Sequence, residues 1–196
     1  MTRLVLALLA ALAATPACAE PATARFRGTV VSRDGEVLVI RRPGGSTLTL
    51  TMNAKTRVFA AIGARARDIK PESYLAVVAD GGPAPEQADQ VTLFSPSERG
   101  FEAGRQPWDT APGASLTAGW IADIRGTGTR RVTLSYEGGH SAFEIAPGTP
   151  VTQIGPGEKA LLQPGAAVTV FTHAAPDGAL QADVVAVGRQ GVVPTL

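Results

Sequence analysis

The sequence predicts an all-β protein built from two copies of one plan. Short runs of alternating apolar and polar residues, rich in β-branched side chains, recur along the chain, and 22 Gly and 15 Pro supply turns between them. Three landmarks recur in the second half at nearly constant spacing: Thr56 and Thr149 lie 93 residues apart, Pro71 and Pro164 also lie 93 apart, and Gln87 and Gln181 lie 94 apart. This spacing indicates a duplicated domain.

The first half is predicted to contain five strands and one short helix. The strands are expected at residues 26–32, 37–40, 48–52, 74–78 and 88–94, with a short extended piece at 56–58. Residues 64–69 have helical composition, and Pro71 limits that helix to one or two turns. Three strands, a short helix and two more strands are the connectivity of an OB-type barrel.

The second half repeats this order. Its strands are expected at residues 116–124, 132–136, 141–145, 167–171 and 180–187, with a short helix at 157–162 and an extended piece at 149–151. We therefore predict two tandem small OB-like five-stranded barrels, each with one short helix, at residues 25–95 and 116–188. Residues 189–196 form a C-terminal tail.

A linker rich in Pro and Gly is predicted at residues 96–115. It contains two large aromatic residues, Phe101 and Trp108. Exposure of such side chains to water is costly. We therefore expect Trp108 to pack against one of the barrels.

The N-terminal residues 1–19 are predicted to be a signal peptide. Arg3 precedes an apolar run at residues 4–14, and Ala17-Cys18-Ala19 offers a cleavage site after Ala19. The mature chain would then lie in the periplasm or be secreted. The alternative is a lipoprotein anchored at Cys18, although Thr15 stands where a lipid-attachment motif usually has a large aliphatic residue.

The charge balance argues against nucleic acid as a partner. Loss of Arg3 would leave 17 basic and 17 acidic residues in the mature chain. A near-neutral chain without a basic run lacks the electrostatic footprint of a nucleic-acid-binding protein. No apolar run after the signal is long enough to predict a transmembrane segment.

The chain resembles a family of exported bacterial domains. The sequences around Gly28, Thr56, Pro71 and Gln87, and their counterparts in the second half, are similar to domains of unknown function of the DUF5666 type. The resemblance implies two tandem copies of a small OB-like barrel. It implies no catalytic residue and no cofactor.

Few residues are candidates for a metal site or a catalytic pair. His140 and His173 could supply part of a metal site, but such a site usually needs three or four ligands; the alternative is two surface histidines. Asp89 and Asp183 occupy equivalent repeat positions, but neither lies in the Asp-Thr/Ser-Gly loop of a paired-carboxylate protease. Each is expected to begin its last strand.

Three aromatic residues are the candidate binding residues. Trp108, Trp120 and Tyr136 could form a patch for a glycan or a peptide, as OB-type surfaces do. Burial in the barrel core is the alternative. We expect an exported, non-catalytic binding or accessory protein whose partner is an envelope protein or polymer. The alternative is a metal-handling protein or hydrolase that uses His140 and His173.

Overall fold

The computed structural model describes residues 24–196 and confirms an all-β fold. The strands are β1 (Ala24–Asp34), β2 (Val37–Arg41), β3 (Thr47–Thr51), β4 (Arg57–Ala64), β5 (Tyr74–Ala79), β6 (Glu86–Gln87), β7 (Gln90–Phe94), β8 (Gly104–Pro107), β9 (Ser115–Arg125), β10 (Arg130–Tyr136), β11 (Gly139–Ile145), β12 (Val151–Pro156), β13 (Ala167–Ala174) and β14 (Leu180–Gly188). The 3-10 turns are η1 (Ala66–Asp68), η2 (Pro96–Glu98) and η3 (Lys159–Leu161).

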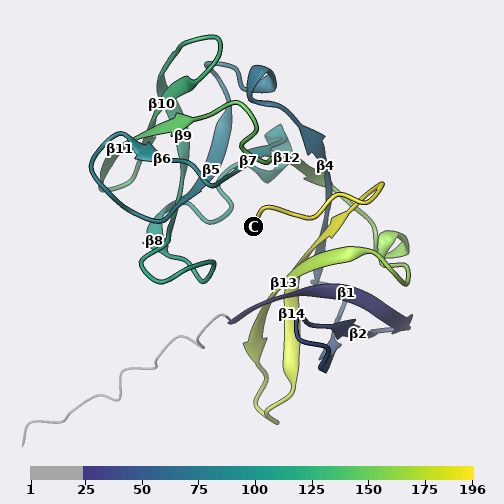
Figure 1. Cartoon of the computed structure of the whole chain (residues 1–196). Coiled ribbons are helices and arrows are strands. Elements are labelled where there is room, and N and C mark those ends of the chain that lie inside the picture. The colour runs from purple at the N-terminus through teal and green to yellow at the C-terminus, as the bar shows by residue number, and fades with distance from the viewer. Residues whose placement is uncertain (1–23) are drawn as a thin grey trace, which may run out of the picture.

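One group of strands comes from both ends of the described chain, and we call it the terminal unit. Strand β1 pairs with β2, β2 with β3, β3 with β14, β14 with β13, and β13 again with β1. The circuit of pairings thus returns to its first strand. Figure 1 shows this unit in the lower half of the molecule.

The second group, which we call the central unit, lies within residues 74–145 and fills the upper half of Figure 1. Strand β7 pairs with β5, β5 with β9, β9 with β10, β10 with β11, and β11 with β6. Because β6 leads into β7 after two residues, this circuit also returns to its start. Strand β8 is an addition that pairs only with β9.

Two strands link the units. Strand β4 pairs in parallel with β14 of the terminal unit, and β12 pairs in parallel with β7 of the central unit. Strands β4 and β12 pair with each other in antiparallel fashion, with Ala61 opposite Ile154. These two residues are separated by 93 positions, the same spacing as the landmarks Thr56 and Thr149.

Three apolar clusters fill the molecule. The first fills the terminal unit and includes Leu38, Ile40 and Val170. The second fills the central unit and includes Leu75 and Phe143. The third lies between the units and gathers aromatic side chains from several segments: Phe59, Tyr74, Phe94, Trp108 and Phe171. Burial of apolar area between the units stabilises their association.

The tandem arrangement is not confirmed. Strands β1 and β5, from residues 25–95, also pair with strands from residues 116–188, as in the pairing of Arg25 with Phe171 and of Tyr74 with Trp120. Each predicted short helix is instead a single three-residue 3-10 turn, η1 and η3. Pro71 and Pro164 follow these turns closely and prevent their extension.

The linking strands are much longer than the predicted extended pieces at 56–58 and 149–151. Strand β4 has eight residues and β12 has six. Both strands have partners on two sides, and their sequences contain small and apolar residues such as Ala61, Gly63 and Gly155. Alternation of polar and apolar residues, the signal used for strands, is therefore weak in them.

The signal peptide predicted at residues 1–19 lies outside the described part of the chain. Within residues 24–196, no helix has the length and apolar character required to cross a membrane.

Candidate functional site

Positions in the two units correspond through strand register, and two glycines make the correspondence clear. A Cβ atom on Gly28 would lie 2.4 Å from the carbonyl oxygen of Arg41, and one on Gly119 would lie 2.4 Å from the carbonyl oxygen of Ser135. Both are closer than Cβ atoms approach in folded proteins. In both units the long first strand thus crosses its neighbour at a residue without a side chain.

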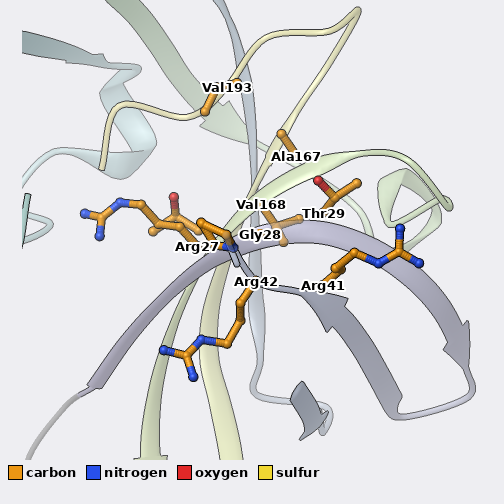
Figure 2. A pocket seen from close by; sticks show the side chains of 10 residues that line it. Arg27, Gly28, Thr29, Arg41, Arg42, Ala167, Val168 and Val193 are labelled. Carbon is orange, nitrogen blue, oxygen red and sulfur yellow. The ribbon is translucent and has the colours of Figure 1, made fainter. Parts of the chain in front are cut away.

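The candidate site is a surface depression of about 450 Å³ on the terminal unit. Strands β1 and β13, the end of β2 and the C-terminal tail form its walls (Figure 2). The residues used below are Arg27, Thr29, Arg41, Arg42, Ala167 and Val193. Val193 is the most exposed large apolar residue of residues 24–196, at 66%.

The corresponding place in the central unit is filled by two aromatic rings. Thr29 lies opposite Ala167 in the terminal unit, and Trp120 lies opposite Tyr74 in the central unit. The rings of Tyr74 and Trp120 meet edge to face at 5.5 Å, and the guanidinium of Arg99 lies 5.0 Å from the Trp120 ring. The depression therefore exists where a small pair, Thr and Ala, replaces an aromatic pair.

Arginine side chains surround the depression. Arg27 donates hydrogen bonds to Asp109 Oδ2 at 2.8 Å and to the main-chain oxygen of Leu196 at 3.1 Å. Arg41 and Arg42 form no ion pair within residues 24–196, and Arg42 lies 5.4 Å from the ring of Phe26. Figure 2 shows the guanidinium groups of Arg27, Arg41 and Arg42 pointing to different sides of the rim. Such a rim can pair with several separated anionic groups.

Asp109 offsets part of this positive charge. Burial alone would raise the pKa of its carboxyl, but the hydrogen bond and charge of Arg27 and the charge of Arg25 outweigh burial and lower the pKa. Asp109 is therefore ionised at neutral pH. Asp109 thus pairs with Arg25 and Arg27, whereas Arg41 and Arg42, on the rim of the depression, have no ion-pair partner within residues 24–196.

The three predicted aromatic binding residues have different environments. Trp108 is only 4% exposed and lies under the guanidinium of Arg25 at 3.8 Å, so its ring is buried in the apolar cluster between the units, as the alternative of burial predicted. Trp120 is 47% exposed. Tyr136 hydrogen-bonds with Ser141 and follows Ser135, the partner of Trp120, so strand alternation turns it to the opposite side. Within residues 24–196, no ring contact joins two of these three.

The two histidines lie on different units. His140 is exposed on β11 of the central unit, and His173 is on β13 of the terminal unit, where its Nδ1 lies 2.8 Å from Asp183 Oδ2. No group of three or more His, Cys, Asp or Glu side chains that could hold a metal ion occurs in residues 24–196.

Asp89 lies near Asp80, and burial, together with that neighbouring charge, raises the pKa of Asp89.

The arginines around the depression were not among the predicted site residues. A signal was available in the sequence. Arg41-Arg42 stands where the corresponding strand of the central unit has Ser135-Tyr136, and Thr29 stands where it has Trp120. Only strand register shows that these differences gather in one place.

Comparison of this chain with protein-family models, curated proteins and solved structures finds no match. Its function must therefore be inferred from its own residues.

Proposed function

We propose that this chain is an exported, non-catalytic binding protein of the bacterial envelope whose ligand occupies the arginine-rimmed depression. One observation carries the proposal. The two units share strand order and register, yet the central unit fills this place with Tyr74 and Trp120 while the terminal unit leaves it open between Thr29 and Ala167. A depression with apolar walls and a charged rim is typical of a recognition site.

The proposal includes a duplicated origin for the two units. The recurring landmarks, the paired Gly28 and Gly119, and the pairing of Ala61 with Ile154 at the repeat spacing support an approximate twofold axis through β4 and β12. We interpret each unit as an OB-like barrel of five strands. Its first three strands come from one half of the chain and its last two come from the other half.

Export is the second part of the proposal. Residues 1–19 have the composition of a signal peptide, and the resemblance to exported DUF5666-type domains agrees with it. In a duplicated pair, a binding site found in one unit only is most simply explained by specialisation of that unit. An envelope protein or envelope polymer is the ligand class available to an exported chain.

The proposal is tested by filling the depression. The mature protein and its T29W variant, which copies Trp120 of the central unit, are immobilised and exposed to an envelope extract. A component retained by the unmodified protein should be lost with T29W. T49W, on the exposed Thr49 of β3, is the matched control and should retain that component.

Thermal unfolding of T29W confirms that the variant is folded before the comparison is made. Retention of the same components by the unmodified protein and by T29W would contradict the proposal. So would a mature N-terminus, measured by mass spectrometry, that still contains residues 1–19.

A further inference from the structure

Strand β9 of the central unit has a neighbour that its counterpart β1 lacks. Along Ser115–Ala118, β9 pairs with β5 on one side and with β8 on the other. Along Ala24–Arg27, β1 pairs with β13 on one side only, because its pairing with β2 begins at Thr29. Within residues 24–196, no strand occupies the other side. The terminal unit thus has an open edge where the central unit has β8.

The backbone groups that face this open edge follow from the hydrogen bonds of the strand. The Val30 N–H donates to the Ala166 carbonyl, and the Val30 carbonyl accepts from the Gly165 N–H, so Val30 faces β13. Alternate residues of a strand direct their backbone groups to opposite sides. Arg25 and Arg27 therefore direct theirs to the open edge and can pair with an added strand.

The side chains beside this edge indicate the charge of its occupant. Arg25, Arg27 and Arg42 lie next to the edge, and Arg41 lies at the adjoining end of β2. Asp109 is the one Asp or Glu side chain that forms an ion pair with any of them in residues 24–196, and the main-chain oxygen of Leu196 also accepts a hydrogen bond from Arg27. Pairing with the same edge of a second copy would bring these arginines together, and like charges on neighbouring strands destabilise a sheet. An acidic occupant removes this repulsion.

We propose that the open edge at Ala24–Arg27 is a strand-addition site for an extended acidic segment of a partner protein. The segment pairs with β1 in antiparallel fashion, as β8 pairs with β9. Its backbone bonds with Arg25 and Arg27, and its carboxylates pair with the arginines around the adjoining depression. This inference rests on the proposed binding function and specifies the partner.

A synthetic peptide in which valine and glutamate alternate is the probe. Isothermal titration calorimetry should show binding to the mature protein. Two matched peptides should bind at least about tenfold more weakly: one with lysine for glutamate, and one with N-methyl groups on alternate amides. The first removes charge complementarity, and the second removes the backbone donors while keeping the charge.

Two further measurements locate the site. R42E should weaken binding of the glutamate peptide by about tenfold or more, whereas R33E, on the exposed Arg33 at the far end of β1 from the open edge, should leave it within about twofold. Amide hydrogen exchange of the unmodified protein should show new protection at Arg25 and Arg27 on peptide addition. Phe26 and Gly28, which face β13, should not change.

Absence of binding, equal binding of the N-methylated peptide, or protection elsewhere in the chain would overturn the inference. Self-association of the chain with protection at Arg25 and Arg27 would overturn it in favour of a second copy as the occupant. These failures differ from failure of the proposed function, because envelope retention by the unmodified protein and its loss with T29W do not depend on the peptide.

Discussion

The central and terminal units share one strand plan but differ in how completely it is covered. In the central unit, β8 occupies the edge of β9, and Tyr74 and Trp120 fill the adjoining surface. In the terminal unit, the corresponding edge of β1 is unpaired within residues 24–196, and the corresponding surface is hollow and bordered by arginines. Features common to both units are those that the strand arrangement requires. The unpaired edge and the hollow surface occur in the terminal unit only and are therefore available for binding.

The largest expected effect concerns which segments of the chain can fold alone. The apolar cluster of the central unit draws only on residues 64–151, so a fragment with these bounds keeps all of its interior partners. A fragment of residues 24–95 keeps β1 to β3 but loses β13 and β14. We expect the first fragment to give a dispersed amide NMR spectrum and the second to remain unfolded as a monomer.

The fragment of residues 24–95 also tests whether the terminal unit requires strands from both ends of the chain. A folded monomer of residues 24–95, shown by a cooperative thermal transition and by sedimentation, would favour the tandem arrangement predicted from the sequence. Folding of that fragment only as a dimer would agree with the observed pairing, because a second copy could supply the missing strands.

The next largest effect is expected at the linking strands. Ile154 is completely buried between the units, and its replacement by Ala should lower the free energy of unfolding by about 2–5 kcal/mol. Ile62, on the partner strand β4, is 42% exposed, so I62A should change it by about 0.5 kcal/mol or less. Denaturant unfolding measures both. Equal effects would show that the contact between the units contributes little.

Substitutions at two glycines test whether positions in the two units correspond. G28A and G119A each place a methyl group against a backbone carbonyl, and each should cost about 1–3 kcal/mol of stability by forcing two strands apart. A methyl group on Gly128 would have no heavy atom of another segment within 4 Å, so G128A is the control and should be close to neutral. A large effect at only one of Gly28 and Gly119 would contradict the correspondence.

The smallest effect is expected at Asp109, which has ion-pair partners only in the terminal unit. Because its pKa is lowered in the folded state, ionised Asp109 stabilises the fold above its unfolded pKa of about 3.9, and this stabilisation is lost as the pH falls through the folded pKa. D109N should therefore be less stable than the unmodified protein at pH 7, by at most about 1 kcal/mol.

Thermal unfolding at several pH values measures this effect, and the difference between D109N and the unmodified protein should disappear in strong acid. D89N is the contrasting variant. The pKa of Asp89 is raised, so its ionised form destabilises the fold as the pH rises, and D89N should be slightly stabilising at pH 7. A pH-independent effect of D109N would show that packing accounts for its role.

The sequence predicted most strands but not their partners. The runs around Val30, Leu38 and Leu134 alternate because one face of each strand is buried, and that signal is local. Which strand pairs with which depends on contacts between distant segments. Because the same landmarks recur in both halves of the sequence, composition and spacing alone did not show which strands pair with which.

The candidate site was less predictable than the fold. The sequence directed attention to Trp120, which fills a surface in the central unit, and away from Thr29, which leaves the corresponding surface open. A small residue in place of a large aromatic one forms no recognisable sequence motif. Arg27 is separated in the sequence from the adjacent Arg41 and Arg42, and only the pairing of β1 with β2 brings the three together.

The pairing of β1 with β13 has a consequence for how the chain is made. Ala24 pairs with Thr172, 148 residues later, so β1 emerges from the ribosome long before its partner. The central unit has all its strands once residue 145 has emerged, whereas the terminal unit must wait for β14. Synthesis from the N-terminus therefore leaves β1 without β13, and β3 without β14, for most of translation. A chaperone that binds unfolded segments would therefore have to cover these strands for longer than any strand of the central unit.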